Sequence, residues 1–237
     1  MIGEKLIRVP IIGSTNDFLK ENWKLFPHGT VIVADVQTTG RGRFNRAWYS
    51  PEGGLWFSVL FKPRKNMRPN FYTKLSAVSI VRSLRPLKVE AKLKWPNDVY
   101  VDGKKLAGIL TETIFEEDRL GAIIVGIGMN VNNEIPKELE KKATSLKLLV
   151  GEELERLSVL SMILREMNRA LRVYSRKPEA LTRVWKNMLI QKEGQLICVN
   201  VGSETLKGEI VQIDDESITL RIQDKTMRLS SLEIVDC

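Results

Sequence analysis

The chain has 237 residues, of which 43% are hydrophobic and 28% are charged, enough for one large globular domain and a small one. No apolar run approaches the ~20 residues of a membrane span, and the N-terminus lacks a secretory signal, so a cytoplasmic protein without membrane attachment is expected. The single histidine, His28, lies in a predicted loop, and Cys198 and Cys237 form no CxxC pair. A Ser-His-Asp triad, a multi-histidine metal centre and a thiolate metal site are therefore disfavoured.

The formal net charge of +8 is unevenly distributed along the chain. Residues 190–237 carry a balance of −4, so the preceding part carries +12. This basic excess suggests an anionic ligand, an acidic protein partner or nucleic acid, although a solvated basic surface explains it equally well. Hydrophobic periodicity changes near residue 190 as well. We therefore expect a large domain over residues 1–189 and a small second domain over residues 190–237.

The first half of the chain alternates short strands with helices. Residues 6–12 predict a strand, and Ser14 has the features of an N-cap for the helix that follows, because Asp17 lies in its first turn. Beyond this cap, the hydroxyls and amide of Ser14-Thr15-Asn16 could bind a polar ligand, although the cap alone is the simpler interpretation. Further strands are predicted over 30–36 and 53–61, and a helix over 69–84.

Four more strands and two helices complete the predicted main domain. The strands cover 89–95, 99–101, 105–115 and 122–132, and Asp102-Gly103 is a typical hairpin turn between the second and third. Apolar residues then recur at helical spacing over 152–176 and 179–189. After residue 190, short strands separated by turns predict a compact β-barrel. The expected fold class is α+β: a mixed, largely antiparallel sheet flanked by helices, with a small C-terminal β-barrel domain.

The segment 37–48, which we call the arginine loop, contains Arg41, Arg43 and Arg46 together with two glycines. Glycines let the backbone approach a ligand, and the guanidinium fork suits phosphate and carboxylate. A small anion with several oxygens is the expected ligand. Taken alone, the loop is equally consistent with nucleic-acid binding.

A second informative stretch is KWPNDVYVDGKKLAG, residues 94–108. Pro96 ends a strand there, so Lys94 and Asn97 lie where side chains leave a sheet, and Lys105 enters the next strand just before Gly108. Lysines at strand entries are usually ordinary surface residues. A glycine that permits close approach of a ligand makes a functional role for Lys105 worth considering.

Taken together, the motifs STN, QTTGRGRFNRAW, SPEGGLWFS, KWPNDVYVDGKKLAG and GIGMNVN resemble those of biotin protein ligases in order and spacing. The resemblance covers residues 10–133. It implies an ATP-dependent ligase that converts biotin and ATP to biotinyl-5′-AMP and pyrophosphate, with Mg²⁺ accompanying ATP. The biotinyl group then passes to a lysine of a biotin carboxyl carrier protein or domain. A homodimer is common in the family.

The resemblance also implies roles for individual residues. Lys105 and Arg43 match the cations that stabilise the reacting carboxylate and phosphate. The positions matching the biotin site are Ser14, Thr15, Asn16, Gln37, Arg41, Gly42, Arg43 and Lys105. The positions matching the ATP or adenylate site are Arg43, Arg46, Trp48, Lys94, Asn97 and Asn130, with Trp48 expected to stack on adenine. The sequence identifies no metal ligands.

Three features of this sequence differ from those of some or most members of the family. Asn45 replaces the third glycine of the arginine loop, and we expect the turn to survive because asparagine tolerates positive φ. Ala47 stands where a polar residue is frequent, which would weaken a contact in loop closure. About a dozen residues precede STN, too few for a helix-turn-helix domain, so neither DNA binding nor transcriptional control is expected.

Two alternatives stay open from the sequence. A nucleic-acid-binding protein could use the arginine loop, but it would leave KWPND and GIGMNVN unexplained. A lipoate-protein ligase has similar chemistry and a linear substrate. On the biotin interpretation, the arginine loop must open for ATP and close over the adenylate, so we expect it to become ordered when biotin binds.

Overall fold

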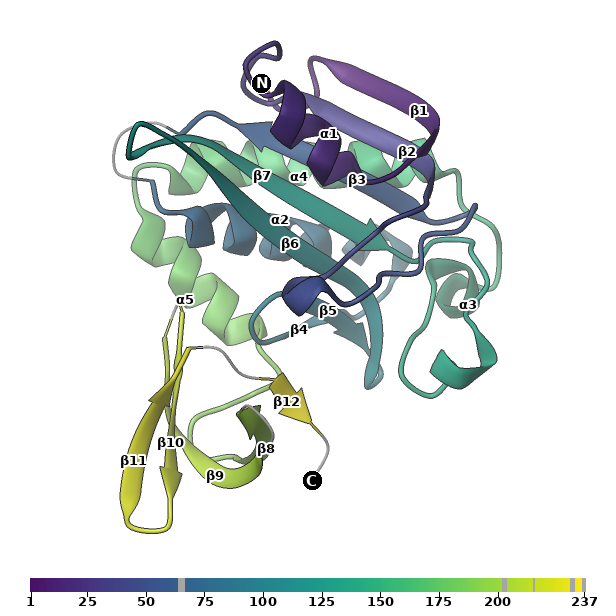
Figure 1. Ribbon diagram of the computed structural model, residues 1–237. Helices are drawn as coiled ribbons and strands as arrows, with labels where there is room; N and C mark the ends of the chain where they lie inside the picture. The colour runs from purple at the N-terminus through teal and green to yellow at the C-terminus, as the bar shows by residue number, and fades with distance from the viewer. Residues whose placement is uncertain (64–66, 202–203, 215, 231–232, 236–237) are drawn as a thin grey trace.

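The structure, a computed structural model, describes residues 1–63, 67–201, 204–214, 216–230 and 233–235. Its larger part is a seven-stranded sheet in the order β1-β2-β3-β7-β6-β5-β4 (Figure 1). β1 and β2 are parallel and the other neighbouring pairs are antiparallel. The strands are β1 (Leu6–Ile12), β2 (Val31–Gln37), β3 (Leu55–Phe61), β4 (Lys92–Lys94), β5 (Asp98–Val101), β6 (Lys104–Glu116) and β7 (Arg119–Met129).

Helices cover the two faces of this sheet unequally. On one face α2 (Pro69–Ser83) and α4 (Arg156–Tyr174) bury the main apolar core, and α5 (Pro178–Met188) packs beside them (Figure 1). On the other face the short helix α1 (Thr15–Asn22) covers a small cluster around Leu19. In the part of the chain that the structure describes, no other α-helix covers that second face, which leaves room for a site.

Local sequence signals account for most of these elements. Ser14 caps α1, with its hydroxyl accepting from the Asp17 N–H, as predicted. Asp102 and Gly103 have positive φ and form the β5–β6 hairpin turn. The strand expected over 89–95 is shorter than predicted, because Val89 N and Ala91 N donate to the nearby Leu84 O and Val89 O and not to a neighbouring strand. A short helix, α3 (Leu146–Val150), was not predicted.

The C-terminal part is a second sheet of five antiparallel strands in the order β11-β10-β9-β8-β12. They are β8 (Leu196–Val201), β9 (Glu204–Ile213), β10 (Ile218–Ile222), β11 (Lys225–Leu229) and β12 (Glu233–Val235). The prediction of a closed barrel is wrong for the described residues, because β11 and β12 form opposite edges of the sheet. A closed barrel requires its two edge strands to form hydrogen bonds with each other. Here β12 has only three residues, and all of them pair with β8. The domain boundary near residue 190 stays a prediction.

Two hydrogen bonds attach the second sheet's entry segment to β4 and the residue after it. Ile190 N donates to Leu93 O at 2.7 Å, and the buried side chain of Gln191 accepts from Trp95 N at 3.0 Å. None of the helices in the described ranges has the length and apolar character needed to cross a membrane.

Candidate active site

The floor of the site follows from side-chain alternation in β7. Its odd-numbered residues, such as Ile123 and Val125, face the helical core, whereas Ala122 and Ile124 face the α1 side. The next two residues of β7 on the α1 side are Gly126 and Gly128. Because they have no side chains, the backbone of the sheet is exposed at this point.

Neighbouring strands extend this floor. In the strand register Gly126 pairs with Ser58 of β3 and Leu110 of β6, and Gly128 pairs with Gly108 of β6. Added Cβ atoms would meet Asn16 Oδ1 at 2.3 Å over Gly126 and Trp48 Nε1 at 2.3 Å over Gly128. The glycines therefore admit side chains that come from outside the sheet, one from α1 and one from the arginine loop.

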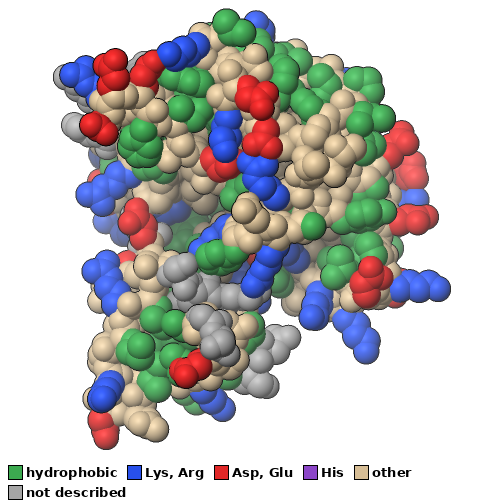
Figure 2. Space-filling model, in the orientation of Figure 1, with side chains coloured by type: hydrophobic (Ala, Val, Ile, Leu, Met, Phe, Trp, Pro, Cys, Tyr) green, Lys and Arg blue, Asp and Glu red, His purple; other side chains and the backbone are tan. Residues whose placement is uncertain are grey.

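A cleft of about 410 Å³ lies over this floor. In the space-filling view, Lys and Arg side chains gather around the hollow between the larger sheet and the C-terminal part (Figure 2). All the site residues predicted from the sequence line this one cleft, although they come from segments far apart in the chain. They are Ser14, Thr15, Asn16, Gln37, Arg41, Gly42, Arg43, Arg46, Trp48, Lys94, Asn97, Lys105 and Asn130.

Hydrogen-bonded polar groups form the end of the cleft beside α1. Gln37 Oε1 accepts from the Thr15 N–H at 2.9 Å and from the Thr15 hydroxyl at 3.0 Å. Ser58 Oγ lies 2.7 Å from Thr15 Oγ1 and donates to Asn16 Oδ1 at 2.6 Å. These buried donors and acceptors are held in fixed directions, which suits recognition of a small polar ring system.

The arginine loop crosses the open side of the cleft as a narrow hairpin. Gly42 N donates to Arg46 O at 2.8 Å, and Arg41 forms an isolated bridge with Ala47. At the tip Asn45 has φ 55°, as expected for the residue that replaces glycine. Phe44 also has positive φ, 58°, which the sequence did not predict. The contact of Ala47 is made by its backbone, so this pairing does not depend on a polar side chain there.

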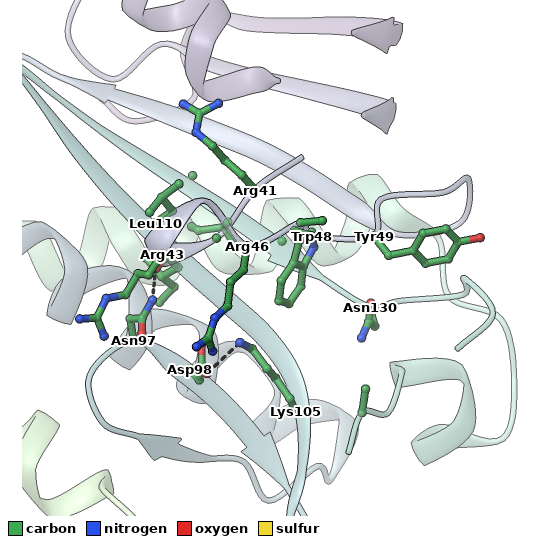
Figure 3. Close-up of a pocket in the computed structure, with 18 of the residues that line it drawn as sticks. Arg41, Arg43, Arg46, Trp48, Tyr49, Asn97, Asp98, Lys105, Leu110 and Asn130 are labelled. Atoms are coloured by element: carbon green, nitrogen blue, oxygen red, sulfur yellow. Dashed lines mark hydrogen bonds and ion pairs between the residues drawn. The ribbon is translucent and has the colours of Figure 1, made fainter. Parts of the chain in front are cut away.

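Cations converge at the middle of the cleft. Arg46 and Lys105 point toward Asp98, whereas Arg43 is directed toward Asn97 in the same cleft (Figure 3). Lys105 Nζ pairs with Asp98 Oδ2 at 2.8 Å and lies 5.0 Å from the centre of the Trp48 ring. Burial lowers the pKa of the Arg43 guanidinium, and the nearby Asp98 carboxylate opposes that shift. Positive charge held in a half-buried cleft suits an anionic ligand.

The indole of Trp48 lies on the glycine floor, beside Lys105. Its ring lies close to Gly108 and Gly128, and its Nε1 is buried without a hydrogen-bond partner. The aromatic face and the free donor suit a flat heteroaromatic group. The segment around Leu139 and Ala143 also lines the cleft, and the strand β12 contributes Ile234.

Three predicted residues have structural partners of their own. Asn97 Nδ2 donates to Ile109 O, which joins the start of β5 to β6. Asn130 Nδ2 donates to Thr144 O at 3.0 Å, and its Oδ1 accepts from Asn133 at 3.1 Å. Lys94 Nζ lies over the Tyr100 ring at 5.2 Å. Asn97 and Asn130 therefore shape the cleft wall, whatever else they contact.

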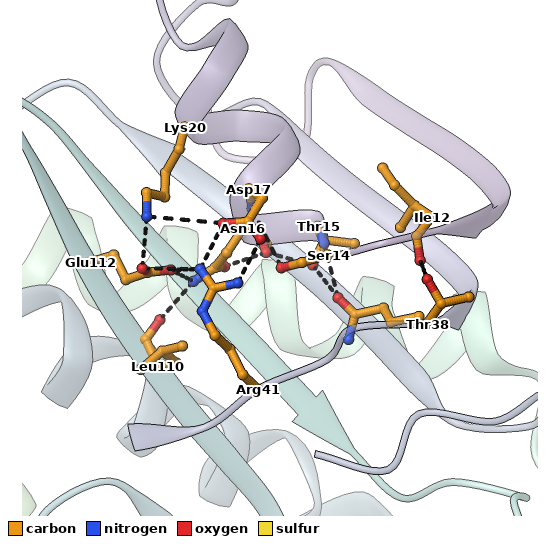
Figure 4. Close-up of polar contacts among 12 residues, drawn as sticks. Ile12, Ser14, Thr15, Asn16, Asp17, Lys20, Thr38, Arg41, Leu110 and Glu112 are labelled. Atoms are coloured by element: carbon orange, nitrogen blue, oxygen red, sulfur yellow. Dashed lines mark hydrogen bonds and ion pairs between the residues drawn. The ribbon is translucent and has the colours of Figure 1, made fainter. Parts of the chain in front are cut away.

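Sequence reasoning missed three carboxylates at the site. Asp98 was read only as part of a turn, although it follows Asn97 in the KWPND motif. Asp17 was read only as a first-turn helix residue, and Glu112 only as part of a strand. Both hold the Arg41 guanidinium (Figure 4). Strand alternation places Glu112 on the same face of β6 as Gly108, and this alternation is the sequence feature that could have identified Glu112 as a site residue.

The sequence is similar to those of known proteins. A model of the Biotin/lipoate A/B protein ligase family matches residues 9–130, more than half of the chain. The bifunctional ligase/repressor BirA of Bacillus subtilis is 35% identical over 235 residues, which cover 93% of this chain and 70% of BirA. The biotin--[acetyl-CoA-carboxylase] ligase of Mycobacterium tuberculosis is 27% identical, with 87% and 79% covered.

Solved structures agree over nearly the whole chain. The biotin protein ligase from Aquifex aeolicus, solved with biotin and ATP, superposes with a TM-score of 0.84 at 30% identity and covers 99% of this chain and 100% of its own. The chain therefore belongs to the biotin/lipoate A/B protein ligase family and, within it, to the biotin protein ligases, which are ATP-dependent ligases.

Proposed function

We propose that the protein activates biotin with ATP to biotinyl-5′-AMP, releases pyrophosphate, and transfers biotin to a lysine of a biotin carboxyl carrier protein or domain. The observation that carries the proposal is the single cleft, which contains a polar pocket beside α1, a group of cations and the Trp48 indole. These three parts correspond to a ureido ring system, a carboxylate meeting a phosphate, and an adenine. The Aquifex aeolicus ligase of the same fold was solved with biotin and ATP.

The polar end is proposed to bind the biotin head. Ser14, Thr15, Asn16 and Gln37 would surround the ureido group, and the backbone at Arg41 and Gly42 would close over it. The side chain of Arg41 is engaged by carboxylates, so its contribution there would come from the main chain. Burial of a ureido group requires such paired donors and acceptors, because an unpaired buried polar group weakens binding.

In the first step a biotin carboxylate oxygen attacks the α-phosphorus of ATP. The new O–P bond forms while the bond to the pyrophosphate oxygen breaks, and pyrophosphate leaves with the electron pair. Two anions must approach each other, and negative charge develops on the phosphate oxygens. Arg43 and Lys105 are proposed as the catalytic cations, since fixed charges in a water-poor site stabilise this transition state.

In the second step the acceptor lysine, as a free amine, attacks the carbonyl carbon of the mixed anhydride. The C–N bond forms, the C–O bond to AMP breaks, and the amine proton is lost to solvent or to the leaving phosphate. The same cations would stabilise the oxyanion. This route requires no protein nucleophile.

The nucleotide side is proposed to use Arg46, Lys94 and Trp48, with Trp48 stacking on adenine. Asn97 and Asn130 would support the wall, and Asn130 Oδ1 retains acceptor capacity toward an adenine amino group. The C-terminal sheet would help to cover ATP, because Ile234 lines the cleft. We also propose that residues 190–237 form a separate domain.

Mg²⁺ is proposed to enter with ATP. Asp98 is the only carboxylate among the described residues that line the cleft, and Mg²⁺ commonly takes one or two carboxylates together with phosphate oxygens. The donor set therefore fits a nucleotide-borne ion rather than a protein-built metal cage. When bound, the ion would neutralise charge on the phosphates beside Lys105.

The proposal includes a homodimer and a cytoplasmic location. β1 is an edge strand with exposed Leu6 and Ile11, which supports pairing through this edge.

ATP–pyrophosphate exchange by the purified protein tests the proposal. Exchange that depends on biotin, and is absent with lipoate or octanoate, is expected. Exchange with lipoate alone would indicate the second substrate class of the family, and no exchange with any acid would refute the ligase activity. Transfer is then measured by mass increase of a carrier domain, with its target lysine replaced by arginine as the control.

A further inference from the structure

The guanidinium of Arg41 is held by two carboxylates from different parts of the fold. It donates to both oxygens of Asp17, on α1, at 2.5 and 2.6 Å. It also donates to both oxygens of Glu112, on β6, at 3.2 Å. The Arg41 side chain is 20% exposed, so water competes little for these bonds. Such bidentate, charge-assisted hydrogen bonds are stronger and more directional than ordinary surface ion pairs.

Glu112 links this ion pair to the proposed biotin pocket. Its Oε2 accepts from Asn16 Nδ2 at 2.7 Å, and Asn16 Oδ1 accepts in turn from the buried Ser58 hydroxyl. Lys20 Nζ contacts Glu112 Oε1 at 3.0 Å, so two cations and two carboxylates balance in charge. One carboxylate therefore touches both the arginine loop and the pocket wall (Figure 4).

The rest of the loop is held differently. The backbone of its tip is linked by Gly42 N to Arg46 O, while the Phe44 side chain is 58% exposed and Asn45 is exposed. Figure 3 shows the Arg41 side chain directed toward α1, away from the side chains of Arg43 and Arg46. The loop thus has a base fixed by side-chain ion pairs and an exposed tip.

We propose that Asp17 and Glu112 are positioning residues that anchor the base of the arginine loop over the biotin end of the cleft. The anchor fixes the main chain at Arg41 and Gly42 against the pocket, and it leaves the tip of the loop able to move when ATP enters. This role rests on the proposed function for its effect on biotin binding, but the anchor itself is a property of the ligand-free chain. Neither carboxylate contacts the reacting atoms.

Hydrogen exchange of the purified full chain without substrates tests the anchor. In Asp17→Asn and in Glu112→Gln, the amides of residues 41–47 are expected to exchange at least about tenfold faster than in the wild type, as for loss of a charge-assisted hydrogen bond. Glu116→Gln is the matched control: it lies four residues along the same strand, on the same face, and pairs with the exposed Lys24. In this control the amides of residues 41–47 are expected to exchange at the wild-type rate.

Asp17 is the more exposed partner, so its variant is expected to fold even if Glu112→Gln does not. Wild-type exchange rates in folded Asp17→Asn would overturn the anchor, as would an equal acceleration in Glu116→Gln. Arg41→Lys retains the charge and loses the fork, and it is expected to restore protection only partly relative to Arg41→Met. Full wild-type protection in Arg41→Lys would contradict a role for the bidentate geometry.

Kinetics separate positioning from a general structural effect. Asp17→Asn is expected to raise the KM for biotin about tenfold, while kcat at saturating biotin and the KM for ATP change less than about threefold. A fall in kcat with unchanged KM for biotin would refute the positioning role. If the wild type shows no biotin-dependent pyrophosphate exchange, the proposed function fails, but the hydrogen-exchange experiment still decides whether the loop is anchored.

Discussion

Lys105 Nζ lies 2.8 Å from Asp98 Oδ2, and the two residues belong to facing strands of one hairpin. The tight turn at Asp102 and Gly103 fixes the register of that hairpin, so the ion pair is set by local structure. The pair holds the lysine ammonium in the cleft before an anion arrives. A substrate carboxylate or phosphate then needs only to replace or join Asp98, and the cation itself does not have to be reoriented.

Replacing Lys105 by methionine keeps its apolar stem and removes the charge. Loss of a cation that meets the reacting carboxylate and phosphate is expected to raise the adenylation barrier by about 3 kcal/mol, or roughly 100-fold in kcat. Biotin-dependent pyrophosphate exchange measures this step. Lys104→Met is the control, since Lys104 is the neighbouring exposed lysine of the same hairpin and does not line the cleft. Similar losses in both variants would remove the catalytic assignment of Lys105.

Gly126→Ala and Gly128→Ala test the glycine floor, and each serves as the control for the other. A methyl group at Gly126 meets the Asn16 amide, whereas one at Gly128 meets the Trp48 indole. Overpacking of this kind costs about 1–3 kcal/mol. The first change is therefore expected to raise the KM for biotin by about tenfold or more, and the second the KM for ATP. Steady-state kinetics with each substrate varied gives the answer, and the reverse pattern would contradict the proposed orientation of the ligands.

The pH dependence of the loop anchor follows from two carboxylates. The hydrogen bond from Arg41 holds the pKa of Asp17 below its ordinary value of 3.8. Burial acts to raise the pKa of Glu112, but hydrogen bonds from Asn16, Lys20 and Arg41 hold it below its ordinary value of 4.5. A carboxylate with a lowered pKa contributes stability above its unfolded pKa and loses it as pH falls through the folded pKa.

Loop protection is therefore expected to be constant from about pH 8 to pH 5 and to be lost only below about pH 4. Arg41 and Lys20 are the cations that face these carboxylates. Hydrogen exchange of residues 41–47, corrected for the intrinsic rate at each pH, measures the effect. A midpoint near pH 6 to 7 would show that another group controls the loop.

The sequence was informative wherever a residue acts through its own backbone or near neighbours. The Ser14 cap, the turn at Asp102 and the positive φ of Asn45 depend on a few consecutive residues, and the structure confirms them. The site residues were found because the motifs were recognised together, and the structure brings them to one cleft.

Contacts between distant segments could not be predicted in the same way. Glu112 meets Asn16 and Arg41 because β6 passes beneath α1 and the loop, and nothing near Glu112 in the sequence indicates this pairing. Closure of the C-terminal sheet failed as a prediction for the same reason, since short alternating strands do not specify which edges pair. The backbone strain at Phe44 is likewise imposed by the hairpin that Arg41 and Ala47 close.

Gln191 connects the C-terminal part to the cleft wall, and its removal is expected to destabilise the fold. Its Oε1 accepts from the backbone N–H of Trp95 in a buried position, and Trp95 lines the cleft. Gln191→Ala leaves that N–H unpaired, which costs about 1–3 kcal/mol and lowers Tm by several degrees. Gln195→Ala is the control, because Gln195 accepts from Lys192 N in an exposed turn. Thermal unfolding and urea midpoints of both variants measure the difference. Equal stabilities would mean that the bond to Trp95 contributes nothing to the attachment between the two parts.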